Sequence, residues 1–144
     1  MTVTPLERAR LAAAAMWKDD HATRWIGMEL ADIAEGSATL SLDVRDHHCN
    51  GHGILHGGIT FSLADSAFAF ACNSRNQVTV AQHNVISYLM PGRKGDRMTA
   101  TAREVSLTGR SGIYDVTVCN QDGMKIAEFR GFSRAIGGQV FDEN

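Results

Sequence analysis

The chain has 144 residues, of which 44% are hydrophobic and 21% are charged, and its formal net charge is −2. This length fits one compact domain with a hydrophobic core, and we expect a single domain over residues 1–144. A chain with so little net charge presents no broad basic surface, so we expect no nucleic-acid partner.

The cysteines and the hydropathy exclude further classes. Cys49, Cys72 and Cys119 are an odd number of cysteines without CxxC spacing, which argues against a disulfide framework and a zinc ribbon. The longest uninterrupted apolar run, residues 67–72, is far shorter than the roughly 20 residues that span a bilayer. We therefore expect a soluble, cytoplasmic protein with no membrane partner.

The N-terminal part predicts a helix and then a hairpin. Thr4 as the cap, Pro5 at the first helical position and Glu7 form a typical helix start, and the helix should run to about Trp17. Residues 26–46 alternate apolar and polar side chains on both sides of a Glu-Gly pair, which predicts two short strands joined by a turn.

The middle of the chain predicts a functional loop and a central helix. Residues 46–58 are rich in glycine, histidine and asparagine, which is typical of a loop, and binding and catalytic residues often lie on loops. Residues 59–72 carry apolar side chains on every side of a helical wheel, so this helix should be buried. In a domain of this size, a sheet that curls around the helix would bury it.

The rest of the chain predicts strands. Glycine-containing turns separate four segments with strand character, and Asp122-Gly123 is a strong hairpin signal. The four expected strands cover residues 78–90, 96–106, 112–120 and 125–136. Together the elements predict an α+β fold in which a long antiparallel β-sheet, arranged as a meander, wraps around a central α-helix.

Three segments resemble one family. "NGHGILHGGITFSLADSAFAFACNS", "YLMPGRKGD" and "FRGFSRAIGG" are similar to the hotdog-fold acyl-CoA thioesterases of the phenylacetate-degradation (PaaI) type. The Asn-Gly-His, His-Gly-Gly and Leu-Ala-Asp elements at their present spacing carry the resemblance, which covers nearly the whole chain. It implies a hotdog fold and the hydrolysis of acyl-CoA thioesters, with phenylacetyl-CoA or ring-hydroxylated arylacetyl-CoA as the expected substrates and free acid and CoA as products.

The resemblance also implies roles for four residues. Asp65 is the expected catalytic carboxylate, acting as general base toward water or as direct nucleophile on the thioester. Gly57 offers its backbone N–H to the thioester carbonyl. Asn50 orients substrate or water, and His56 lines the site. No metal or redox cofactor is implied, because coenzyme A is part of the substrate.

Elementary chemistry gives these roles a physical reason. Thioester hydrolysis places negative charge on the carbonyl oxygen, and the first amides of a helix are free donors at the positive end of its dipole. Gly57 and Gly58 let a ligand approach the backbone closely at that point. Asp65, a lone carboxylate among apolar neighbours, should have a raised pKa unless hydrogen bonds or cations offset the desolvation.

The spacing of the two main groups predicts a shared site. Gly57 and Asp65 are eight residues apart, which along an α-helix is about 12 Å. One substrate carbonyl cannot readily meet both groups of one chain, so we expect a homodimer with shared active sites, formed by paired central helices or edge-joined sheets. The resemblance implies the same arrangement, with dimers that often pair into tetramers.

The substrate's phosphates and acyl group need further contacts. Two turns supply candidate coenzyme A contacts. The first, "PGRKGD" and the residue after it, holds Arg93, Lys94 and Arg97, and the second, "GRSG", holds Arg110, Ser111 and Gly112. Candidate linings of an apolar acyl pocket, each of which could equally belong to the core, are Phe61, Phe68, Tyr88 and Met90.

Other interpretations remain open at this level. Asp65 could be a buried structural carboxylate that caps a turn or pairs with an arginine. The His47, His48, Cys49, His52 and His56 cluster invites a metal site, but zinc usually needs a second ligand pair further along the chain, so no metal is expected.

The fold also leaves other functions open. A hotdog dehydratase or isomerase would use His56 as a base, and a non-catalytic acyl-CoA-binding sensor would not need Asp65. Cys49 and Cys72 are nucleophiles only in principle; Cys72 lies in the most apolar run, where thiols usually serve as packing groups.

Overall fold

The computed structural model describes residues 2–144. Its helices and strands follow one another in the order that the sequence predicts, apart from one additional short helix. The elements in chain order are α1 (Pro5–Asp19), α2 (His21–Ile26), β1 (Glu29–Ala34), β2 (Ser37–Asp43), a 3₁₀ turn (Asp46–His48), α3 (Gly57–Cys72), β3 (Thr79–Tyr88), β4 (Arg97–Thr108), β5 (Ser111–Cys119) and β6 (Lys125–Ala135).

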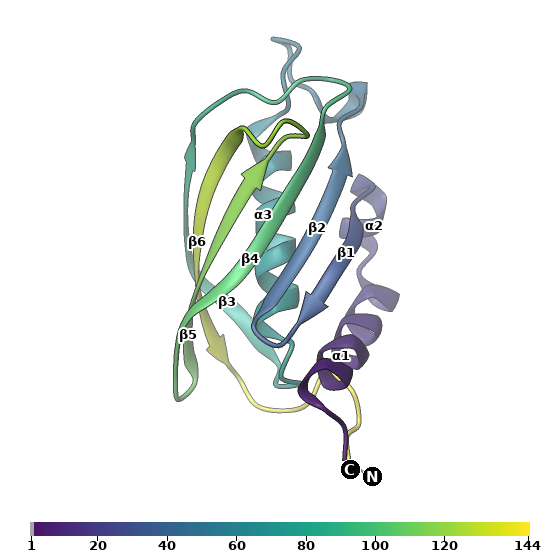
Figure 1. The fold of residues 1–144 in the computed structure, drawn as a ribbon, viewed down its shortest axis with the longest axis vertical. Coiled ribbons are helices and arrows are strands. Elements are labelled where there is room, and N and C mark those ends of the chain that lie inside the picture. The colour runs from purple at the N-terminus through teal and green to yellow at the C-terminus, as the bar shows by residue number, and fades with distance from the viewer. Residues whose placement is uncertain (1) are drawn as a thin grey trace.

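The strands form one six-stranded sheet whose order is β1-β2-β4-β5-β6-β3, and each neighbouring pair is antiparallel. The sheet curves around α3, and α1 lies beside β1 at its outer edge (Figure 1). The predicted α+β architecture, a long antiparallel sheet around a central helix, is confirmed.

The predicted meander is wrong in one respect. β3 does not lie between β2 and β4; it pairs with β6 at the far edge of the sheet, and β2 pairs with β4. The chain crosses the sheet's concave face through α3, adds β3 at the opposite edge and returns through residues 89–96 to β4. Alternating hydropathy identifies strands but not their partners, so the sequence pattern could not show this crossover.

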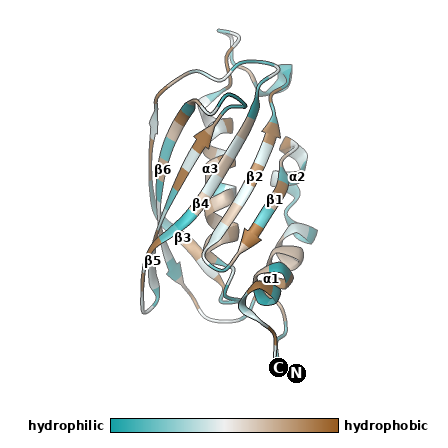
Figure 2. Ribbon diagram, viewed as in Figure 1, coloured by the Kyte–Doolittle hydropathy of each residue, from teal (hydrophilic) through white to brown (hydrophobic). Residues whose placement is uncertain are grey.

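The core lies between α3 and the strands that curve around it (Figure 2). The buried side of the helix carries Leu63, Ala67, Phe68 and Ala71. The expectation of a fully buried helix is only partly correct, because one side of α3 stays half-exposed. That side is lined by the small or polar residues Ser62, Asp65, Ser66 and Ala69.

A close contact fixes α3 against the sheet. Gly131 on β6 faces the ring of Phe68, and a Cβ built at position 131 would lie 2.7 Å from that ring. Phe68 also packs against Tyr114 and Phe129, with ring centroids 5.7 and 5.9 Å away. The missing side chain at Gly131 therefore lets the central aromatic residue sit directly on the strand.

The N-terminal helix begins as predicted. The Thr4 hydroxyl accepts the N–H of Glu7 at 3.1 Å, and the Glu7 carboxylate accepts the N–H of Thr4 at 3.2 Å, which is a capping box. The helix ends at Asp19, two residues beyond the predicted end. α2, which was not predicted, follows at once: Asp20 caps it by accepting the Thr23 N–H, and Gly27 ends it with φ of 100°.

Candidate active site

The N-terminus of α3 presents one free backbone donor. His56 is the N-cap residue, and its Nδ1 accepts the N–H of Gly58 at 2.8 Å. Among residues 2–144, no group accepts a hydrogen bond from the N–H of Gly57. Of the two glycines that the sequence offered as donors, Gly57 therefore keeps its N–H for a ligand, whereas the N–H of Gly58 is occupied by the cap.

A cavity of about 440 Å³ lies beside Gly57. The Tyr88 hydroxyl at its wall donates a hydrogen bond to the carbonyl of Gly57 at 3.0 Å. A Cβ at position 57 would lie 3.3 Å from the Tyr88 ring, so even alanine would crowd this wall. The cavity is lined by Asn50, Ile54, Leu55, Gly57, Thr60, Tyr88, Leu89, Met90, Pro91, Gly92 and Ile126.

Asn50 shapes the loop that borders this cavity. Its Oδ1 accepts the backbone N–H groups of His52 at 2.9 Å and Ile54 at 3.4 Å, and its own N–H donates to the carbonyl of Ile54 at 2.9 Å. These bonds close a tight turn over residues 50–54. Asn50 thus has a structural role in addition to lining the cavity.

Asp65 lies in the middle of α3 and is half-buried. Burial raises the pKa of its carboxyl group, and a hydrogen bond from Asn84 on β3 partly offsets that increase. In this bond Nδ2 of Asn84 donates to Oδ1 of Asp65 at 3.3 Å. No arginine or lysine pairs with Asp65 in the part of the chain that the structure describes. The alternative interpretation, in which Asp65 is a structural carboxylate paired with an arginine, therefore has no support among the described residues.

One chain does not bring Gly57 and Asp65 to the same point. Both residues belong to α3, where eight residues correspond to about 12 Å along the axis. Asp65 does not line the cavity that holds Gly57 and Asn50. Within a single subunit, the free N–H of Gly57 and the carboxylate of Asp65 therefore cannot both reach the thioester of one bound substrate.

The expected coenzyme A contacts are divided between the two ends of the molecule. Arg93 pairs with Ile54 through a β-bridge near the cavity, and Lys94 forms an exposed ion pair of 2.9 Å with Asp46. Arg110 lies at the other end, where it lines a cavity of about 510 Å³ with Arg75 and Asn76. Ser111 and Gly112 line a smaller hollow of about 310 Å³ near the same end. One subunit does not gather these residues around Gly57.

The candidate acyl-pocket residues fall into two groups. Tyr88 and Met90 line the cavity beside Gly57. Phe68 belongs to the core, with 1% of its surface exposed, and Phe61 packs edge-on against Phe129 at 5.5 Å. The two candidates on α3 therefore belong to the packing of the domain, whereas the two at the end of β3 reach the cavity.

The loop histidines have individual structural contacts. Nδ1 of His48 accepts the N–H of Arg45 at 3.0 Å, so its Nε2 is the nitrogen that donates to the carbonyl of Ile26 at 2.7 Å. His47 stacks on this ring, with a centroid distance of 4.0 Å. Within residues 2–144, no three histidine, cysteine or acidic side chains are grouped in a way that could hold a metal ion.

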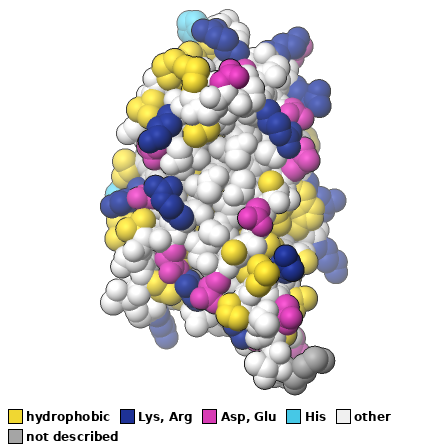
Figure 3. Space-filling view, in the orientation of Figure 1, with side chains coloured by type: hydrophobic (Ala, Val, Ile, Leu, Met, Phe, Trp, Pro, Cys, Tyr) yellow, Lys and Arg dark blue, Asp and Glu magenta, His cyan; other side chains and the backbone are white. Residues whose placement is uncertain are grey.

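The cysteines and the surface add little further chemistry. Burial raises the pKa of the Cys72 thiol to about 12, so this cysteine is protonated at neutral pH and is a poor nucleophile. Cationic and anionic side chains alternate over the face seen in Figure 3 and form no broad patch of one sign. In the described part of the chain, no helix has the length and the apolar character that crossing a bilayer requires.

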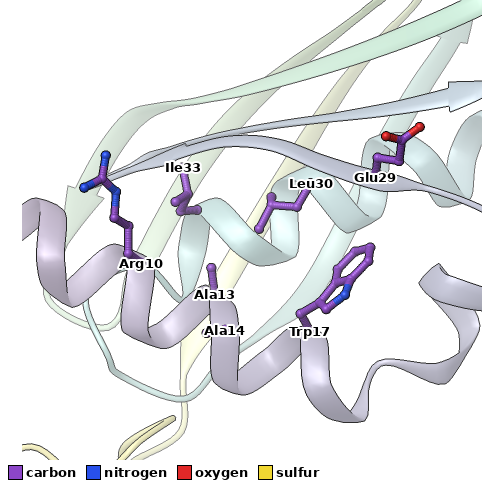
Figure 4. Close-up of a pocket in the computed structure, with 7 residues that line it drawn as sticks. All are labelled: Arg10, Ala13, Ala14, Trp17, Glu29, Leu30 and Ile33. Atoms are coloured by element: carbon purple, nitrogen blue, oxygen red, sulfur yellow. The ribbon is translucent and has the colours of Figure 1, made fainter.

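A second apolar hollow lies away from these residues, between α1 and β1. It has a volume of about 520 Å³, and the ring of Trp17 stands at one end and the guanidinium of Arg10 at the other (Figure 4). None of the residues that the sequence suggested for the site lines it.

Sequence reasoning missed Asn84, the one side chain that donates to Asp65 among the described residues. The available signal was an amide among the apolar residues of a strand that follows the central helix. The strand has an irregular register between Ala81 and His83, so counting along it could not show which side chains face α3.

Comparison with known proteins agrees with the fold. The sequence profile of the Thioesterase superfamily matches residues 52–127. The acyl-coenzyme A thioesterase PaaI of Escherichia coli (strain K12) is 40% identical over 131 residues, which are 91% of this chain and 94% of that protein. A structure of the E. coli PaaI protein from the phenylacetic acid degradation operon has a TM-score of 0.93 at 39% identity, covering 94% of this chain and 99% of that chain.

Another solved structure shows a relative with a ligand. A Streptococcus mutans protein bound to acetyl-CoA has a TM-score of 0.76 at 26% identity, covering 78% of this chain and 91% of that chain. The sheet wrapped around α3 is a hotdog fold, and the sequence matches extend over nearly all of it. The chain therefore belongs to the Thioesterase superfamily, and its relatives include enzymes named acyl-CoA thioesterases.

Proposed function

We propose that the protein hydrolyses acyl-CoA thioesters, with phenylacetyl-CoA or a ring-hydroxylated arylacetyl-CoA as substrate, by Asp65-directed attack of water. The 40% identity to an acyl-CoA thioesterase over 91% of the chain supports the reaction class. The observation that carries the mechanism is the pair formed by the free N–H of Gly57 and the half-buried, cation-free carboxylate of Asp65. The phenylacetic acid degradation operon of the E. coli relative supports the arylacetyl group.

In the proposed reaction, the thioester carbonyl oxygen accepts a hydrogen bond from the N–H of Gly57 at the positive end of α3. The Asp65 carboxylate takes a proton from water while the water oxygen bonds to the carbonyl carbon. The tetrahedral intermediate then breaks its C–S bond. The proton held by Asp65 goes to the departing CoA sulfur, and the free acid remains.

The two groups come together when two subunits share a site. β3 is a ten-residue edge strand with one free side, and Val80, Val85 and Tyr88 on it are exposed. Such an edge readily pairs with another strand. Asp65 bonds Asn84 on this strand, so the carboxylate lies on the side of α3 that a partner joined at β3 would approach.

A twofold axis midway between Gly57 and Asp65 would place Gly57 of each subunit beside Asp65 of its partner. The same twofold rotation would place the partner's residues near Cys72 beside the loop that holds Asn50. Arg110 shares a small cavity with Cys72, so the dimer would bring a cationic side chain of the partner to the Gly57 cavity. We propose that Arg93, Lys94 and the partner's Arg110 contact the phosphates of coenzyme A, and that two such dimers pair into a tetramer.

The acyl group fits the apolar part of the same cavity. The cavity beside Gly57 has a volume of about 440 Å³, which lies within the range of small-ligand pockets. Tyr88, Met90 and Ile126 supply an aromatic and aliphatic wall. This lining suits a phenyl ring better than a charged acyl group, because a charged group would lose its hydration without gaining a partner.

Release of free thiol from a panel of acyl-CoA thioesters tests the proposal, with the wild type and Asp65→Asn measured side by side. We expect the wild type to hydrolyse an arylacetyl-CoA and the variant to bind it but turn it over at least about 10²-fold more slowly. Ser62→Ala, one helical turn from Asp65, is the matched control and should keep most of the activity. Binding without turnover by the wild type would instead identify an acyl-CoA sensor.

A further inference from the structure

We infer that Asn84 is a positioning residue for the reaction: its amide holds Oδ1 of Asp65 so that Oδ2 is the oxygen that reacts. The inference rests on the proposed function, in which Asp65 directs the attack. Asn84 Nδ2 donates to Asp65 Oδ1 at 3.3 Å, and no hydrogen bond reaches Oδ2 from any described residue. The two carboxylate oxygens are therefore different, with one tied to β3 and the other available to water.

β3 contacts both groups of the proposed site. Asn84 binds Asp65, and Tyr88, four residues later on the same face of the strand, binds the carbonyl of Gly57 at 3.0 Å. Four residues of a strand span about 13 Å, and the eight residues of α3 between the two partners span about 12 Å. One strand thus fixes the height of both groups along the helix.

The other end of the Asn84 amide supports a role in positioning over a role in stability. Oδ1 of Asn84 is buried and has no hydrogen-bond partner among residues 2–144. An ionised carboxylate only accepts hydrogen bonds, so the amide must turn its NH₂ toward Asp65 and leave the oxygen unpartnered. A buried, unpartnered amide oxygen costs free energy. The chain accepts this cost at the residue whose amide donates to Asp65.

The surroundings of Asp65 contain few other groups that could set its titration. On α3, the Cys72 thiol stays protonated because its pKa is raised to about 12. On β3, His83 precedes Asn84 but stacks on Phe132 of β6, with ring centroids 5.1 Å apart. On α2, Asp20 reaches α3 only through Thr23, which bonds Ser66 at 3.0 Å. Burial and Asn84 are the causes that shift the Asp65 pKa.

The pH dependence of kcat/KM distinguishes a positioning role from a packing role. The bond from Asn84 lowers the pKa of Asp65, so its removal should move the acidic limb of the profile to higher pH. We expect Asn84→Ala to shift this limb upward and Asn84→Asp to shift it further, because a second carboxylate disfavours ionisation. At neutral pH, kcat should fall about 10- to 100-fold while KM changes little.

The control is Ser87→Ala, which removes a polar group from the opposite face of β3 and should leave both the limb and kcat unchanged. The thermal unfolding midpoint of Asn84→Ala should stay close to that of the wild type, because the unpartnered oxygen is lost together with the hydrogen bond. An unshifted acidic limb with unchanged kcat in both Asn84 variants would overturn the inference. If Asp65→Asn is then still inactive, the proposed function survives. If the wild type hydrolyses no thioester, both the proposed function and the role of Asn84 are wrong.

Discussion

The ionised carboxylate of Asp65, which the proposed reaction needs, lowers the stability of the folded protein. Its side chain is half-buried on α3 with a single amide donor, and burial raises its pKa. A raised pKa means that the folded protein holds the ionised form less favourably than the unfolded chain does. The protein therefore loses some stability at neutral pH through a carboxylate that the proposed reaction needs.

This loss of stability gives a prediction for Asp65→Asn. The pKa of Asp65 is higher in the folded protein than its value of about 3.9 in the unfolded chain. Asp65 therefore destabilises the folded state fully at a pH above the folded pKa, and this effect disappears at a pH below the unfolded pKa. The variant should be more stable than the wild type at neutral pH, by no more than about 1 kcal/mol since solvent screens a partly open group. Urea unfolding at several pH values measures the difference. A variant less stable at neutral pH would show that Asp65 has a structural role.

The sequence could predict part of the site at this scale. Gly57, Asp65 and Asn50 stand in local motifs, so their positions on a loop or helix follow from the chain itself. The contact between Asp65 and Asn84 joins residues 19 positions apart and depends on the register of β3 past an irregularity. The cap formed by His56 was also missed, because an N-cap histidine is uncommon and its ring nitrogen could equally have faced the cavity.

At the scale of elements, the packing of α3 on β6 allows no extra atom. Ala at position 131 would place a Cβ 2.7 Å from the Phe68 ring, which is buried and has no space to move. We expect Gly131→Ala to destabilise the fold by about 1–3 kcal/mol. Chemical denaturation measures this, and Gly51→Ala, with no atom within 4 Å of the added carbon, is the control that should change little.

A second substitution tests the cause of that effect. Phe68→Leu in the Gly131→Ala background removes the ring and should recover part of the lost stability, although Phe68→Leu alone should destabilise. If the two losses simply add, the clash with Phe68 is not what destabilises Gly131→Ala.

Elements were predicted better than their pairing. The strands of the second half and the start of α1 follow from local alternation and capping residues, which act over a few positions. α2 was missed because six residues are too short to show periodicity, although Asp20 and Gly27 mark its two ends. The pairing of β3 with β6 depends on the crossover through α3, which is a property of the whole fold and not of any one segment.

At the scale of the whole molecule, a single subunit contains both groups of the proposed site but holds them apart. The free N–H of Gly57 and the carboxylate of Asp65 lie about 12 Å apart along one helix. The exposed edge of β3 lies beside both, since Asn84 and Tyr88 on this strand bond Asp65 and Gly57 respectively. We propose that a second subunit joined here completes the site.

Mixed dimers of two inactive chains show whether two subunits share a site. Asp65→Asn removes the carboxylate, and Gly57→Val blocks the donor, whose neighbourhood is already tight against Tyr88. The two chains are co-expressed with different tags, and the mixed dimers are purified and assayed for thiol release. A shared site leaves one of the two sites intact, so we expect about half of the wild-type activity.

The control pairs a wild-type chain with a chain that carries both substitutions. With shared sites, each site of this dimer holds one altered residue, and we expect almost no activity. With sites confined to one chain the results reverse: the dimer of two single variants stays inactive, and the dimer with one wild-type chain keeps about half of the activity. That reversed result would show that each chain holds a complete site of its own.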